Sequence, residues 1–116
     1  MTVLERKNKL DKRYSKINII LFGNILRISE RKRIKVLAYI IEHADYTNCL
    51  SFTFNDIAAD QKINRVTASE AIHDYIIAGF IKRNGRNTMV NPDVVMIDAN
   101  GSQEELKQKF SNFGLR

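Results

Sequence analysis

The sequence predicts a mostly α-helical domain that carries one small β-hairpin. Two observations lead to this fold class. Two short stretches with helical spacing of apolar residues flank a polar turn between residues 54 and 78. Further on, Asn84-Gly85 stands between two short strand-like runs, which is a strong hairpin signal. With 116 residues, 44% of them hydrophobic, the chain suffices for one domain with a modest core.

The N-terminal third is strongly basic. Residues 1–35 contain 11 Lys and Arg but 3 acids, while the whole chain carries a net charge of +6. Residues 1–15 show no apolar stripe, so we expect them to form a flexible basic arm. A polyanion such as nucleic acid is the simplest partner for this charge. A solvated surface that only aids solubility is an equal alternative.

Two helices are expected between residues 18 and 43. Leu21, Ile25 and Ile28 have helical spacing, which predicts a helix from about Asn18 to Arg27. Ser29 is the expected N-cap of a second helix, which ends near His43. The inward face of this second helix is expected to comprise Ile34, Leu37, Ala38 and Ile41, widened by Val36 and Ile40. The first helix, INIILFGNIL, is more apolar than one small domain needs, which predicts a homodimer unless this helix simply completes the core.

A short strand and two further helices follow. The stretch CLSFTF alternates, with Leu50, Phe52 and Phe54 on one face. Asn55 is the expected N-cap of the next helix, and Asn64 caps another that runs from about Arg65 to Ala78. The buried face of that last helix is expected to comprise Ala68, Ala71, Ile72 and Tyr75. Between the two helices, either Lys62 has a left-handed backbone, which is uncommon for a residue other than glycine, or the turn is slightly different.

The remaining chain is predicted as a hairpin and a final helix. Gly79 follows the preceding helix as its C′ residue. Asn91-Pro92 ends the second strand of the hairpin, and Ser102 with Glu105 marks the start of the last helix. We therefore divide the chain into a basic arm (1–15), a domain (16–98) and a C-terminal helical tail (99–116).

The order helix, turn, helix, hairpin is that of a winged helix-turn-helix, and the spacing of Ala58, Ile63 and Asn64 resembles that family. One departure is Gln61-Lys62, which stands where the family usually has a Leu-Gly pair. The stretch GFIKRNGRNTMVNPDVVM further resembles the RepL-type plasmid replication proteins of low-GC Gram-positive bacteria, over roughly Leu50 to Phe110. This resemblance implies a small DNA-binding protein that acts at a replication origin, without nuclease or ATPase chemistry.

In a winged helix, the second helix of the pair enters the major groove of double-stranded DNA, and the hairpin, or wing, reaches flanking phosphates or the minor groove. The recognition-helix residues expected to bind DNA are Asn64, Arg65, Thr67, Ser69, Glu70 and His73. Those of the wing are Lys82, Arg83, Asn84, Arg86 and Asn87, and those of the arm and the basic helix are Lys12, Arg13, Arg31, Lys32 and Arg33. A transcriptional repressor would use the same face. An adaptor that recruits replication proteins and a single-strand binder are further alternatives.

No motif predicts an enzyme, a cofactor or a metal site. The chain has no glycine-rich phosphate loop and no G-x-S-x-G sequence. His43 and Cys49 are too few for a four-ligand zinc site. A tyrosine acting as a DNA-nicking nucleophile would need a metal-binding histidine cluster, and the chain has two His. The single Cys, the lack of an apolar signal-peptide core and the lack of an 18-residue apolar run together predict a cytoplasmic protein.

Overall fold

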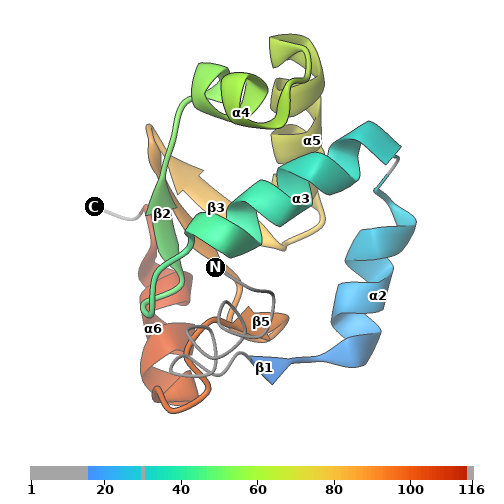
Figure 1. Cartoon of the computed structure of the whole chain (residues 1–116). Helices are drawn as coiled ribbons and strands as arrows, with labels where there is room; N and C mark the ends of the chain where they lie inside the picture. Colours follow the sequence, from blue (N-terminus) through green and yellow to red (C-terminus); the bar gives the residue numbers. More distant parts are fainter. Residues whose placement is uncertain (1–15, 30, 115–116) are drawn as a thin grey trace, which may run out of the picture.

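The computed structural model describes residues 16–29 and 31–114 and confirms the predicted class, mostly α with a small hairpin (Figure 1). The helices are α2 (Ile19–Arg27), α3 (Arg31–His43), α4 (Phe54–Gln61), α5 (Arg65–Ile77) and α6 (Gln103–Asn112). The strands are β1 (Lys16–Ile17), β2 (Cys49–Ser51), β3 (Ile81–Asn84), β4 (Asn87–Val90) and β5 (Val95–Met96). The predicted basic arm, with Lys12 and Arg13, lies outside the described residues.

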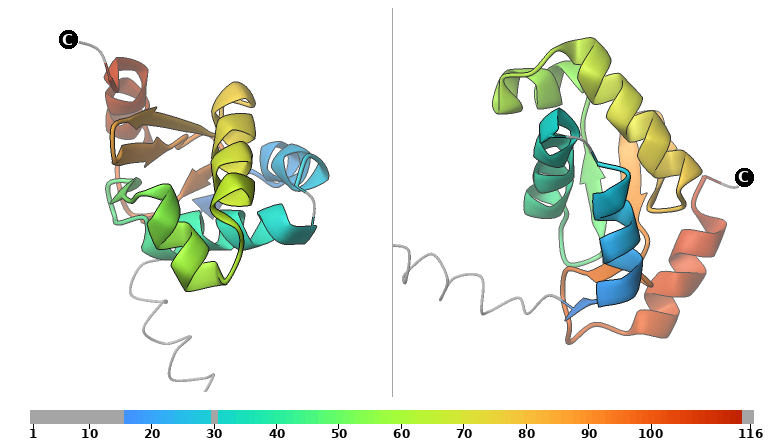
Figure 2. Two further views of the ribbon diagram at one scale, coloured as in Figure 1. Left: turned by 90° about the horizontal axis from the view of Figure 1, so that it is seen from above. Right: turned by 90° about the vertical axis from the view of Figure 1, so that its right-hand side faces the viewer.

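The strands β2, β4 and β3 form an antiparallel sheet in that order, and β1 pairs separately with β5. Helices α3, α4 and α5 lie against one another beside this sheet, and α6 covers its other face (Figure 2). This arrangement is compatible with a winged helix in which β3 and β4 are the wing. Successive residues of β4 show the two-sided packing, because Val90 joins the main core and Met89 joins a small cluster with Leu106 of α6.

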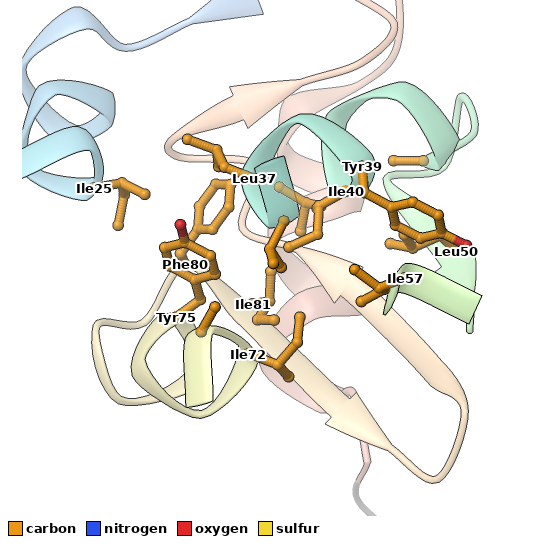
Figure 3. Packing of buried hydrophobic residues seen from close by; sticks show 14 of the residues in the cluster. Ile25, Leu37, Tyr39, Ile40, Leu50, Ile57, Ile72, Tyr75, Phe80 and Ile81 are labelled. Carbon is orange, nitrogen blue, oxygen red and sulfur yellow. The ribbon is translucent and has the colours of Figure 1, made fainter. Parts of the chain in front are cut away.

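The main core is built where α3, α4 and α5 meet the sheet. Ile40, Ile57 and Ile72 converge there from the three helices (Figure 3). All four residues predicted for the inner face of α5 are buried: Ala68, Ala71, Ile72 and Tyr75. The two alanines allow the helix backbones to approach closely, because a larger side chain would hold them apart.

The predicted inner face of α3 was partly wrong. The buried residues of α3 are Val36, Leu37, Tyr39 and Ile40, whereas Ile34 is exposed and Ala38 and Ile41 are half-buried. The physical reason is that α3 has two apolar neighbours. Its well-covered side faces α4 and α5, and the side with Ile34 faces α2 across an open groove.

Three local predictions also need correction. Thr53, not Asn55, is the N-cap of α4: its hydroxyl accepts from the Asp56 N–H (3.1 Å), and the Asp56 carboxylate accepts from the Thr53 N–H (2.8 Å). Consequently β2 ends at Ser51 and Phe54 belongs to the helix.

In the hairpin, Asn84 pairs with Asn87, so the two-residue loop is Gly85-Arg86 and Arg86 stands at its tip. Gly85 has φ +62°, as the first loop residue of a type II′ turn requires.

Asn48 is a buried polar residue that joins three strands. Its amide nitrogen donates to the carbonyls of Val90 (3.1 Å) and Val95 (2.7 Å), and its side-chain oxygen accepts from the Ile97 N–H (3.0 Å). Its own backbone is left-handed, with φ 63°, a conformation that Asn tolerates better than most residues. The side chain therefore fixes where β5 lies relative to β2 and β4.

We expect Asn48→Ala to lower the free energy of unfolding by about 3 kcal/mol or more, because two carbonyls and one N–H would lose a buried partner. Urea denaturation measures this loss. Asn112→Ala, on the exposed end of α6, is the matched control and should cost far less. Similar losses in the two variants would show that the Asn48 bonds contribute little.

Candidate nucleic-acid interface

The turn between α4 and α5 sets the start of the recognition helix. Lys62 has φ 54° and ψ 50°, so the predicted left-handed turn residue is confirmed. The Asn64 side chain accepts from the Val66 N–H (2.7 Å), which confirms it as the N-cap of α5. The first turn of α5 contains no acidic residue, so the positive end of its helix dipole suits a phosphate group.

The outer face of α5 carries most of the predicted contact residues. Arg65, Glu70 and His73 are exposed, and Thr67 and Ser69 are half-buried on its flanks. The predicted polar residues of α5 therefore point away from the main core. With a diameter of about 10–12 Å including side chains, such a helix fits the major groove of DNA.

The acidic residues of α5 are paired with α3. Arg33 lies 3.4 Å from the Glu70 carboxylate and also forms an ion pair with Asp74. Glu70 is thus partly neutralised, and its negative charge opposes a nearby phosphate less strongly than an isolated carboxylate would. The Arg33 side chain, predicted as a DNA contact, is only 20% exposed and is held by these two carboxylates. Its neighbours Arg31 and Lys32 are exposed at the start of α3.

The Phe54 ring connects the recognition helix to the hairpin. The Arg65 guanidinium lies 5.8 Å from the ring centroid, and that of Arg83 lies 4.9 Å from it. Arg83 also donates to the Phe52 carbonyl (3.0 Å) and to the Thr88 hydroxyl (3.3 Å). Burial lowers the pKa of Arg83 from its ordinary value. These contacts hold one guanidinium of the hairpin and one of α5 near the same ring, so both elements carry positive charge where they approach the start of α4.

The other wing residues lie in two places, near α6 and at the loop end of the hairpin. Lys82 is turned toward α6, where its ammonium donates to the Phe110 carbonyl (2.8 Å) and lies 4.7 Å from the Phe110 ring centroid. Lys82 therefore stabilises the C-terminal end of α6 and is set apart from Arg83. Asn84, Arg86 and Asn87 are exposed at the loop end of the hairpin.

Two residues of this face were missed in the sequence. Val66, 58% exposed, lies in the first turn of α5 beside Arg65, and Lys62 is exposed in the turn. The signal for Val66 was available, because it lies off the helical stripe of Ala68, Ala71 and Ile72. An apolar side chain at this end of a recognition helix can contact the methyl group of thymine.

The family model for the Firmicute plasmid replication protein (RepL) matches residues 1–116. The chain belongs to this family. Its role therefore lies in plasmid replication, which bears out the resemblance seen in the sequence. No significant match was found among curated proteins or among solved structures. Within residues 16–29 and 31–114, no helix of this RepL protein combines the length and apolar character that a membrane span needs.

The orientation of α5 depends on the Tyr75 hydroxyl, which gives a testable prediction. This hydroxyl lies 2.7 Å from the Ser29 hydroxyl and 3.0 Å from the Arg33 carbonyl, and the Ser29 hydroxyl lies 2.8 Å from the Ile25 carbonyl. We expect Tyr75→Phe to cost about 1–2 kcal/mol of unfolding free energy, because the contacts between α5 and the α2–α3 junction are lost. Chemical denaturation measures this cost. Tyr46→Phe is the control, since Tyr46 is 66% exposed; equal effects would contradict the assignment.

Proposed function

We propose that this RepL protein binds double-stranded DNA sequence-specifically at the replication origin of its plasmid. In this proposal α5 enters the major groove and the tip of the hairpin lies on the adjacent backbone. The observation that carries it is the exposed start of α5 with Arg65 and Val66, together with the Phe54 ring that both Arg65 and Arg83 approach. Binding is the activity, and we assign no reaction to the protein.

Base recognition is assigned to the residues at the start of α5. The fork of Arg65 can donate two hydrogen bonds to a guanine, and the methyl groups of Val66 can contact a thymine. Ser69 and His73 lie further along the helix, where they can contact bases or backbone. Sequence preference thus arises from a few side chains held on a helix whose inner face is fully packed.

Affinity is assigned to phosphate contacts at three places. The N-terminal N–H groups of α5 offer one, the exposed Arg31 and Lys32 of α3 a second, and Arg86 at the hairpin tip a third. Arg83 has a structural role rather than a phosphate-binding one, because its hydrogen bonds to Phe52 and Thr88 hold the hairpin against the start of α4.

Titration of duplex and single-stranded oligonucleotides at several salt concentrations tests the proposal. Selection of bound fragments from random duplex DNA first supplies the site. About five to eight phosphate contacts predict a slope of log affinity against log salt near −5 to −7. A preference for single strands, or no binding to either form, would contradict the proposal; the latter result would favour an adaptor that recruits replication proteins.

Arg86→Ala should weaken binding to specific and random duplexes by a similar factor and reduce the salt slope by about one. The reason is that the hairpin tip contacts phosphate rather than base edges. Lys107→Ala is the matched control, since this lysine is exposed on α6 and pairs with Asp93 (3.2 Å). Equal losses in the two variants would show that the hairpin tip has no part in binding.

Arg65→Ala should instead reduce discrimination at one base pair of the selected site by about 1–3 kcal/mol. Val66→Ser should reduce discrimination at a neighbouring thymine, while the salt slope stays the same in both variants. Repeating the selection with each variant measures these changes. An unchanged selected site would place base recognition elsewhere on the protein.

A further inference from the structure

Helix α2 packs one apolar side on the core and exposes two isoleucines on the other side, where Arg27 donates to the Asn24 side-chain oxygen (2.9 Å). Phe22 and Ile25 pack toward the main core, whereas Ile19 and Ile20 on the other side are 83% and 77% exposed. Large apolar side chains that are exposed next to one another commonly mark an interaction surface. Among residues 16–29 and 31–114, nothing covers the outer side of α2.

Gly23 lies in the middle of this outer side, four residues after Ile19 and three before Leu26. A Cβ atom added at Gly23 would meet no atom within 4 Å, so packing within the described part of one chain gives no reason for glycine there. Glycine is among the poorest helix formers, and its usual benefit is to let another backbone come close. The outer side of α2 therefore has the form of a helix-crossing surface.

A groove of about 360 Å³ runs along the same side of the molecule, between α2 and α3. Its lining is almost wholly apolar: Phe22 and Leu26 from α2, and Ile34, Leu37 and Ile41 from α3. This groove is the reason that Ile34 of α3 remains exposed. A branched apolar side chain from another molecule would fill it.

We propose that two copies of the chain associate through α2, with the two helices antiparallel and crossing at Gly23. In this arrangement Ile19 and Ile20 of each copy enter the α2–α3 groove of the other, beside Leu26. In a two-fold interface the same surface of each copy must carry both the projecting side chains and the groove that receives them. The surface around α2 carries both, with Ile19 and Ile20 as the projecting side chains and the α2–α3 groove as their receptor. The antiparallel direction also keeps the two Arg27 side chains apart and opposes the helix dipoles.

The extent of the apolar surface fits a second copy. Other exposed apolar residues lie on the two flanks of α2. Leu26 and Ile34 belong to the groove with α3, whereas Leu21, Ile28 and Ile77 lie toward the end of α5. Ile19 and Ile20, together with Leu26 and Ile34 of the groove, expose on the order of several hundred Å², a large part of the ~800 Å² that each partner buries in a stable interface. Helix α2 lies at the edge of the molecule away from the hairpin (Figures 1 and 2), so the wing stays uncovered in the pair.

The first test measures the mass of the full chain without DNA by sedimentation over a range of concentrations. We expect a dimer for the parent chain and a monomer for Ile20→Glu, with at least a tenfold loss of association. At a protein concentration low enough to keep the parent monomeric as well, the two urea midpoints should be the same, because association itself stabilises the folded state. Tyr46→Glu, on the loop after α3, is the control and should remain dimeric. A monomeric parent would overturn the proposal. So would a dimer that tolerates Ile20→Glu. A lower urea midpoint for Ile20→Glu at the concentration where the parent is also monomeric would overturn it too, because it would mean that the chain covers its own α2.

The second test locates the crossing point. In a Cys49→Ser background, Gly23→Cys introduces a single thiol, and the open space around Gly23 keeps the variant folded. A disulfide needs its two Cα atoms about 4.4–6.8 Å apart, so rapid oxidation to a covalent dimer requires the crossing at Gly23. Ser111→Cys, exposed on α6, is the control; cross-linking no faster than this control would overturn the proposed geometry. Both tests omit DNA, so their outcome is separate from that of the proposed DNA binding.

Discussion

The hydroxyl group of Tyr75 fixes how α5, the predicted recognition helix, is turned about its axis. The Tyr75 ring packs edge-on against Phe80 with centroids 5.7 Å apart, and its hydroxyl reaches Ser29 and the Arg33 backbone. Because two hydroxyls hold only two protons, two of the three short contacts among Tyr75, Ser29 and the carbonyls of Ile25 and Arg33 are hydrogen bonds at any instant. Rotating α5 by one residue would remove this buried hydroxyl from all its partners. The exposure of Arg65 and Val66 therefore follows from a contact on the opposite side of the same helix.

The basic residues around α5 and the hairpin are of two kinds. Some hold the fold together, and others remain available to a ligand. Arg33 is held by two carboxylates of α5, and Arg83 by a carbonyl, a hydroxyl and the rings of Phe52 and Phe54. Each of these cations joins elements that are distant in the sequence. Arg86, by contrast, is exposed at the hairpin tip. Net charge alone thus overstates the number of cations that a nucleic acid can meet.

The sequence predicted features that depend on near neighbours. The bounds of α5, its buried stripe, its Asn64 cap and the left-handed Lys62 all follow from residues within one or two turns. The errors have longer-range causes: the exposure of Ile34 depends on how α2 lies beside α3, and the role of Lys82 depends on Phe110, 28 residues away. The structural role of Asn48 was not predicted, because its partners Val95 and Ile97 lie 47 and 49 residues further on. No local pattern marks such a residue.

The hairpin is rigid at its base because both faces of β4 are covered. Val90 belongs to the main core, and Met89 lies in the cluster with Met96 and Leu106 under α6. Thr88 is buried as well and bonds Arg83, so only the loop end of the hairpin is exposed. A hairpin held in this way cannot fold down onto DNA as a hinge. In the proposed complex, the distance between α5 and Arg86 is set before binding. Less conformational entropy is therefore lost on association. A duplex must also have the groove shape that matches this distance, so its shape contributes to recognition.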